Sequence, residues 1–229
     1  MSSDKKSILW DLPVRLSHLA MIVLVGLSWY TAENMHVFAF GPQDGPSDFD
    51  IHVWSGIALL VVVLFRILWG VFGSTTARFS QFLKGPRAVL NYIRGQTDAG
   101  FGHNPLGGLS VVTLIALLLI QPLIGLTSSE DTFGLEGPLK HLVSTETSYW
   151  LASIHKIIFN VLLVFISLHL CAILYYRVIR KDKIISPIIT GRSEKDAPEG
   201  LVIQPVWCAL IFLAAAATII WAALAFFEK

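Results

Sequence analysis

The stretch LASIHKIIFNVLLVFISLHLCAILYYRV, residues 151–178, decides the fold because it is long, apolar and carries two histidines. A helix of about 20 mostly apolar residues crosses a bilayer, so this stretch predicts a membrane-spanning helix. Ionisable side chains inside such a span are costly and mark functional sites. His155 and His169 lie 14 residues apart, which is about 21 Å along a helix and returns the side chain to within about 40° of its starting direction. Both histidines therefore face the same side of the predicted helix.

Further apolar stretches meet the same criterion, at residues 14–32, 51–73, 107–127 and 204–226. The chain of 229 residues is 54% hydrophobic and 14% charged, whereas soluble domains carry roughly 25% charged residues. The composition thus predicts an all-α integral membrane protein with five spans. A formal net charge of +1 argues against nucleic acid as a partner.

The segments that connect the spans alternate in charge. The first and third loops are acidic, whereas Lys and Arg gather before the first span, in the second loop and after the fourth span. Cytoplasmic loops carry the excess of Lys and Arg, so we expect the N-terminus in the cytoplasm and the C-terminus on the outer side. The basic residues are Lys5, Lys6, Arg15, Arg78, Lys84, Arg87, Arg94, Arg177, Arg180, Lys181, Lys183, Arg192 and Lys195.

This orientation sorts four histidines into two depths. His52 and His155 lie near the outer ends of their spans, whereas His18 and His169 lie toward the cytoplasm. Two imidazoles from facing helices suit the two axial positions of a haem iron in a bundle core. Zinc requires four ligands, and the predicted spans contain no carboxylate, which weakens both a zinc site and a proton relay. We therefore expect the helix bundle to bind two haems, His52 with His155 outside and His18 with His169 inside.

Four more residues are candidate haem contacts. Gly56 follows His52 by one turn, and its missing side chain leaves room for a flat macrocycle. Arg66 follows His52 by 14 residues, so it shares that face at the inner depth, where a guanidinium matches a haem propionate. Snorkelling of Arg66 to the cytoplasmic interface is the alternative. Arg15 and Lys156, each close to a proposed ligand, are further candidates.

Three other histidines are not expected to bind a metal. His36 and His141 fall in the outer loops, where we expect them to be solvated. His103 precedes the third span in the sequence GHNPLGG, in which Asn104 is a predicted helix cap and Pro105 lies in the first turn. A role for His103 near the inner haem or a quinone is the alternative.

Several short motifs follow one another along the chain, namely RLSH at 15–18, HVWSG at 52–56, RILWG at 66–70, HNPLG at 103–107, His155-Lys156 with His169, and ITGR at 189–192. In their order and spacing, these motifs resemble those of the bacterial cytochrome b561 family, which includes the b-type cytochrome subunits of nickel-iron hydrogenases. The resemblance covers about residues 8–192. Leu19 departs from the family pattern, which often has Trp after the first ligand, and this affects local packing only.

The resemblance implies a di-haem cytochrome b of the bacterial inner membrane that transfers electrons between the quinone pool and a periplasmic redox partner. That partner would be a c-type cytochrome or an oxidoreductase subunit. Residues 1–192 would form a four-helix transmembrane bundle that binds two haems, and residues 193–229 a linker and an additional C-terminal span. Two alternatives stay open, namely a self-contained superoxide:quinone oxidoreductase and the b-type subunit of a nickel-iron hydrogenase. Membrane lipid is an expected partner, and whether the chain is itself an enzyme or forms a homodimer is left open.

Overall fold

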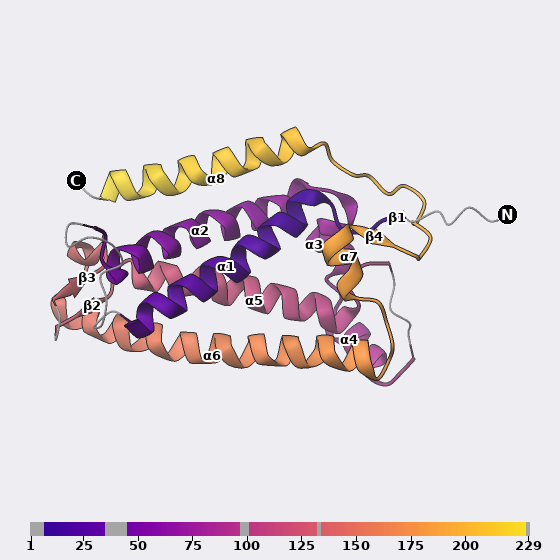
Figure 1. Ribbon diagram of the computed structural model, residues 1–229, viewed down its shortest axis with the longest axis horizontal. Coiled ribbons are helices and arrows are strands. Elements are labelled where there is room, and N and C mark those ends of the chain that lie inside the picture. The colour runs from indigo at the N-terminus through magenta and orange to yellow at the C-terminus, as the bar shows by residue number, and fades with distance from the viewer. Residues whose placement is uncertain (1–6, 35–44, 97–100, 132–133, 228–229) are drawn as a thin grey trace. The chain divides into compact units, whose positions relative to one another are not determined.

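The computed structural model describes residues 7–34, 45–96, 101–131 and 134–227. In this part of the chain, five helices are long and apolar enough to cross a membrane, which confirms the predicted all-helical membrane architecture. They are α1 (Leu12–Asn34), α2 (Asp48–Phe72), α5 (Pro105–Gly125), α6 (Thr145–Val178) and α8 (Val206–Phe227) (Figure 1). Of the residues discussed above, Lys5, Lys6 and His36 lie outside the described ranges.

Short elements connect these helices. Between α2 and α5 lie the 3-10 turn η1 (Thr75–Ala77) and the helices α3 (Phe79–Phe82) and α4 (Pro86–Ile93). The 3-10 turn η2 (Lys140–Leu142) precedes α6, and α7 (Ile185–Thr190) follows it. Two antiparallel pairs complete the described structure, β1 (Ser7–Ile8) with β4 (Arg192–Ser193) and β2 (Ser129–Glu130) with β3 (Leu135–Glu136) (Figure 1).

Helix α2 begins earlier than the apolar pattern predicts. The Ser47 N–H donates to Asp50 Oδ2 at 2.8 Å, and the Asp50 N–H donates to Ser47 Oγ at 3.1 Å, so the two residues cap the helix reciprocally. This cap extends α2 back to Asp48, and two aspartates thereby enter the helix. Helix α6 likewise begins before its apolar stretch, at Thr145, and includes Glu146, and α1 ends with Glu33 and Asn34. These acidic residues lie outside the apolar stretches 14–32, 51–73 and 151–178, which contain no carboxylate.

The described fold forms two compact units, each assembled from segments far apart in the sequence. Unit 1 comprises Met1–Ser17, Arg66–Ile115 and Leu163–Phe212. Unit 2 comprises His18–Phe65, Ala116–Leu162 and Leu213–Lys229. The predicted domains, residues 1–192 and 193–229, are consecutive ranges of the sequence, whereas these units are defined by contacts in space. The predicted division stays a prediction.

Trp69 is fully buried in unit 1 and contacts residues at the start of α1 and in α8. Its indole Nε1–H donates to Asp11 Oδ2 at 2.9 Å, and Asp11 Oδ1 accepts the Val14 N–H at 2.8 Å. Asp11 therefore caps the N-terminus of α1 and ties it to α2. Trp69 also contacts Phe212 of α8, with ring centroids 6.1 Å apart.

The core of unit 2 is an apolar cluster that includes part of α8. Leu60, Leu126 and Leu139 are buried together, and Ile220 and Leu224 of α8 pack against them. At the end of α8, the Nε2–H of His141 donates to the Phe227 carbonyl at 2.6 Å. The His141 side chain is exposed, as the sequence predicts.

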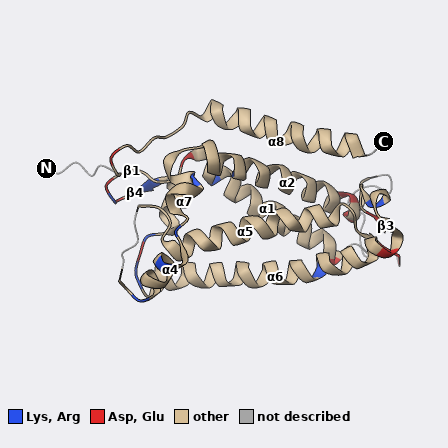
Figure 2. Cartoon of the chain, turned by 180° about the vertical axis from the view of Figure 1, so that it is seen from behind, with Lys and Arg blue, Asp and Glu red and all other residues tan. Residues whose placement is uncertain are grey.

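The charged residues differ between the two units. In unit 1, Lys and Arg gather at α4 and near β4, whereas acidic residues mark β3 in unit 2 (Figure 2). This separation matches the alternation of charge among the loops, on which the predicted orientation in the membrane depends.

Candidate functional site

The imidazoles of His52 and His155 lie next to each other in unit 2. Their ring centroids are 6.2 Å apart, and the ring planes make an angle of 78°. His52 lies on α2 and His155 on α6, so two helices supply the pair. The structure thus brings together the two histidines that the sequence predicts for an outer site.

A backbone carbonyl of another helix fixes each imidazole. His52 Nδ1 lies 2.8 Å from the Ser28 carbonyl oxygen on α1, and His155 Nδ1 lies 3.0 Å from the Gln121 carbonyl oxygen on α5. A carbonyl can only accept, so Nδ1 carries the proton in both rings and Nε2 keeps its lone pair. This is the arrangement of metal-binding histidines, whose other ring nitrogen donates to a carbonyl or a carboxylate.

The pair has the spacing expected for a metal ion between the rings. With metal–nitrogen bonds of about 2 Å, two imidazoles on opposite sides of one ion have centroids roughly 6 Å apart, and the observed distance is 6.2 Å. Among the described residues, no group of three or more His, Cys, Asp or Glu side chains is placed to hold a metal. Two imidazoles without a third ligand do not suit zinc but suit the axial positions of a haem iron.

The family model of prokaryotic cytochrome b561 matches residues 9–191. The chain belongs to this family. It is therefore a multi-pass b-type membrane cytochrome that functions in electron transport, and the family implies b-type haem as its cofactor. No curated protein and no solved structure matches the chain significantly. The matched region contains α1 to α7, so α8 lies outside the part that the family model describes.

Two glycines of this cytochrome lie close to the histidine pair. A Cβ at Gly125 on α5 would lie 3.0 Å from His155 Cε1, so α5 approaches the ring this closely because position 125 has no side chain. A Cβ at Gly56 would meet Pro122 Cβ at 4.0 Å and no nearer described atom. Gly56 thus has free space beside it, and its contact with a macrocycle stays a prediction. The sequence did not predict a role for Gly125, because a glycine at the end of an apolar stretch does not show which side chain of another helix approaches it.

We expect Gly125→Val to displace the His155 ring and to leave the protein with one haem fewer than the wild type. The branched side chain would enter space that the imidazole occupies, since even a Cβ there is at 3.0 Å. Haem content per chain, from the pyridine haemochrome spectrum, measures the effect. Gly26→Val on α1 is the matched control, because no described atom lies within 4 Å of a Cβ at that position. Unchanged haem content in Gly125→Val would contradict the close approach.

Two buried side chains of unit 2 have oxygens without a hydrogen-bond partner in the described structure. They are Gln121, through Oε1, and Asp48, through both Oδ atoms. Gln121 is 8% exposed and Asp48 is 1% exposed, and a buried acceptor without a donor destabilises a fold. The backbone of Gln121 holds His155, so its unpaired side chain is consistent with a group outside the polypeptide completing this region.

The inner pair predicted from the sequence comprises His18 on α1 and His169 on α6. Helix α6 runs without interruption from Thr145 to Val178, which confirms that one helix carries both His155 and His169. Both inner histidines are half-buried. His18 belongs to unit 2 and His169 to unit 1, and their pairing stays a prediction.

Arg66 lies inside unit 1 with its guanidinium enclosed by protein. It is 4% exposed, Nη1 donates to the Ala77 carbonyl at 3.4 Å, and Cζ lies 5.7 Å from the centroid of the Phe79 ring. The carboxylate of Asp11 adds a favourable electrostatic interaction. Pairing of Arg66 with a haem propionate stays a prediction.

Arg15 and Lys156 have protein partners in the structure. The Arg15 guanidinium donates to the carbonyl oxygens of Ile188, at 3.2 Å, and of Ile189, in the last turn of α7. Lys156 Nζ forms an exposed ion pair with Glu130 at 2.8 Å. These contacts account for both cations without a cofactor, and their predicted contacts with haem stay predictions.

His103 lies in an aromatic cluster of unit 1. Its ring centroid is 4.6 Å from that of Trp10 and 4.9 Å from that of Phe82. The next residue, Asn104, accepts the Gly107 N–H through Oδ1 at 2.7 Å, and α5 begins at Pro105. The predicted cap of the third span is therefore confirmed.

A pair of phenols joins α4 to α6 in unit 1. The Tyr92 and Tyr176 hydroxyl oxygens lie 2.7 Å apart, and Asn104 Nδ2 donates to the Tyr176 oxygen at 3.0 Å. Burial, together with the hydrogen bond to Tyr176, raises the pKa of Tyr92 to about 12. Tyr92 is therefore a neutral phenol throughout the physiological pH range.

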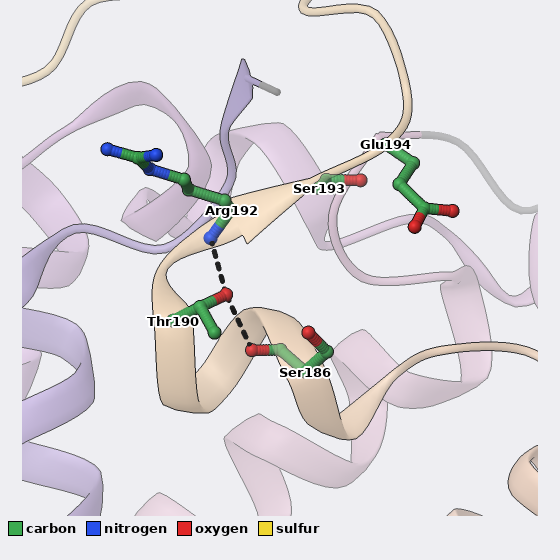
Figure 3. A pocket seen from close by; sticks show the side chains of 5 residues that line it. All are labelled: Ser186, Thr190, Arg192, Ser193 and Glu194. Carbon is green, nitrogen blue, oxygen red and sulfur yellow. Dashed lines mark hydrogen bonds between the residues drawn. The ribbon is translucent and has the colours of Figure 1, made fainter. Parts of the chain in front are cut away.

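A polar hollow lies at α7 and β4 in unit 1 (Figure 3). Its polar groups satisfy one another, because Thr190 Oγ1 donates to the Ser186 carbonyl at 2.9 Å and accepts the Arg192 N–H at 3.2 Å. Glu194 forms an exposed ion pair with Lys183 at 2.7 Å. We assign no ligand to this hollow, which is lined by Ser186, Thr190, Arg192, Ser193 and Glu194.

Proposed function

We propose that this cytochrome binds two haems b and transfers electrons between the quinone pool and a periplasmic redox partner. The first haem lies between His52 and His155, and the second between His18 and His169. The observation that carries this proposal is the His52–His155 pair, in which both Nδ1 atoms are bonded to carbonyls and the rings are 6.2 Å apart.

The protein's own residues position the cofactors in this proposal. Helix α6 supplies one ligand to each haem, and the carbonyls of Ser28 and Gln121 hold the outer rings with Nε2 free. Arg66 is the proposed partner of an inner propionate. A haem with two histidine ligands has no open coordination position, so it supplies single-electron transfer rather than substrate binding.

The charge pattern supports an orientation with the His52–His155 pair toward the periplasm of a bacterial inner membrane. Near β2 and β3, Glu130 and Glu136 form ion pairs with Lys156 and Lys140, whereas the exposed Asp131 and Glu146 add negative charge to the same loop and to the first turn of α6. An acidic outer surface is complementary to a basic protein and would increase the rate of encounter with it. A basic c-type cytochrome is therefore the proposed partner on that side.

The test reconstitutes the purified holoprotein in lipid vesicles and follows the haem α-band. We expect decylubiquinol to reduce the haems, and mitochondrial cytochrome c, used as a basic probe, to reoxidise them. Enzymatically generated superoxide, with superoxide dismutase as the control, is supplied to a parallel sample with oxidised decylubiquinone. Steady quinone reduction by superoxide without another protein would support the self-contained oxidoreductase instead. Haems that decylubiquinol does not reduce would overturn the link to the quinone pool.

A further inference from the structure

A closed ring of hydrogen bonds joins α1 and α2 at His52. The His52 Nδ1–H donates to the Ser28 carbonyl at 2.8 Å, and Ser55 Oγ donates to the His52 carbonyl at 2.9 Å. The Ser28 and Ser55 hydroxyl oxygens lie 2.6 Å apart and close the ring. All three residues belong to unit 2, and Ser55 is buried.

The direction of each hydrogen bond in this ring follows from the donor inventory. A serine hydroxyl has one proton, and Ser55 uses it on the His52 carbonyl, which can only accept. The hydroxyl of Ser28 must therefore donate to Ser55 Oγ. As a result, the two serines connect the backbone of His52 to the carbonyl that holds its own imidazole.

Thr31 adds a second side-chain donor to the same carbonyl. Its Oγ1 lies 2.9 Å from the Leu27 carbonyl oxygen and 3.2 Å from the Ser28 carbonyl oxygen, and the residue is 1% exposed. Two donors that share one acceptor weaken each other. The Thr31 hydroxyl has one proton and lies nearer to the Leu27 carbonyl, so it reduces the attraction of the Ser28 carbonyl for the His52 proton only in part.

His155 has no comparable ring. Its Nδ1–H donates to the Gln121 carbonyl at 3.0 Å, and no described hydroxyl donates to that carbonyl. The two imidazoles of the outer pair thus differ in the side chains that hydrogen-bond around their carbonyl acceptors. The hydroxyl ring is a property of His52 alone within this pair.

We propose that Ser28 and Ser55 are positioning residues for His52, and that Thr31 adjusts the basicity of its imidazole. The inference rests on the proposed function, in which His52 is an axial ligand of the outer haem. A stronger Nδ1–H···O bond makes Nε2 more basic, and a more basic axial ligand lowers the reduction potential of the iron. The serines keep this bond short, and Thr31 weakens it.

The test compares variants of the full-length holoprotein by redox titration of the outer haem, identified as the haem lost in His52→Ala. We expect Ser55→Ala and Ser28→Ala each to raise its midpoint potential. The double variant should shift it no further than the single ones, because both residues belong to one ring. Thr31→Val removes the competing donor and should lower the potential. A fall in the midpoint potential of Thr31→Val, opposite to the rise in the two serine variants, is the result that supports the proposal most directly.

Electron paramagnetic resonance adds a readout of ring orientation. Nearly perpendicular axial imidazoles give a strongly anisotropic low-spin signal, and the 78° angle between the planes predicts such a signal for the outer haem. Ser55→Ala should change the largest g value, and Ser55→Thr, which restores the hydroxyl, should return it toward the wild-type value. Ser153→Ala is the control, because this exposed hydroxyl donates to the Tyr149 carbonyl within α6 and should leave the signal unchanged.

The outcomes separate the two proposals. If His52→Ala keeps every haem, His52 is not a ligand, and the proposed function and the positioning role are both overturned. If His52→Ala loses one haem but Ser28→Ala, Ser55→Ala and Thr31→Val keep the wild-type potential and signal, the proposed function stands and the positioning role is wrong. Should Ser55→Ala lose the haem altogether, the shifts in midpoint potential of Ser28→Ala and Thr31→Val decide whether the positioning role is correct.

Discussion

His52→Ala and His155→Ala will each give a protein that binds one haem b instead of two, and both variants will lose the same haem. The reason is that each residue supplies one of the two axial nitrogens of the outer site, where the rings are 6.2 Å apart. His18→Ala and His169→Ala will lose the other haem. Reduced-minus-oxidised spectra with haem quantification on all four variants measure this pattern.

Two other histidines provide the controls for haem loss. His141 is exposed and donates to the Phe227 carbonyl, and His103 packs between Trp10 and Phe82. Their alanine variants should keep both haems. The pairing is contradicted if His52→Ala and His155→Ala lose different haems, or if haem loss is confined to the two control variants.

Asp11→Ala will destabilise the protein by about 2–4 kcal/mol, because it removes a helix cap and the acceptor of the hydrogen bond that the buried Trp69 indole donates. Both contacts are made by the same carboxylate, which accepts from Val14 at 2.8 Å and from Trp69 at 2.9 Å. The buried Arg66 would also lose its favourable interaction with this charge. Thermal unfolding of the purified protein in detergent, followed by circular dichroism, should show a clearly lower midpoint.

A graded series of variants tests how much the contacts of Asp11 contribute to the stability of the protein. Asp11→Asn keeps one oxygen that can accept from Val14 or Trp69, so its midpoint should fall between those of Asp11→Ala and the wild type. Asp196→Ala, which removes an exposed carboxylate, should unfold with the wild-type midpoint. Equal midpoints for Asp11→Ala and Asp196→Ala would show that the buried carboxylate contributes nothing.

The sequence predicted the features that depend on residue type and spacing along one helix. The five spans follow from runs of apolar residues, and the common face of His155 and His169 follows from helical geometry. The Asn104 cap likewise depends only on neighbouring residues. The first turn of α2 belongs to the same class, since Ser47 and Asp50 form a recognisable capping box, but hydropathy alone placed the start of the helix too late.

The features that the sequence did not predict depend on how different helices meet. Ser28 and Gln121 hold the outer histidines through backbone carbonyls, which every residue has, so their side chains give no signal. Gly125 matters only because α5 passes next to His155. The hydrogen bond between Asp11 and Trp69 joins residues 58 positions apart. The pattern of residues along one helix does not predict such contacts between helices.

The short pairing of β1 with β4 has a consequence for how the protein is made. It joins Ser7 to Ser193 and Ile8 to Arg192, at the two borders of the region that the family model matches. Translation delivers β1 long before β4, so β1 has no partner strand until the ribosome has synthesised everything through α7. The pairing of β1 with β4 is thus a late contact that the earlier helices do not need. An affinity tag fused ahead of Ser7 therefore needs a linker long enough to leave this late step unobstructed.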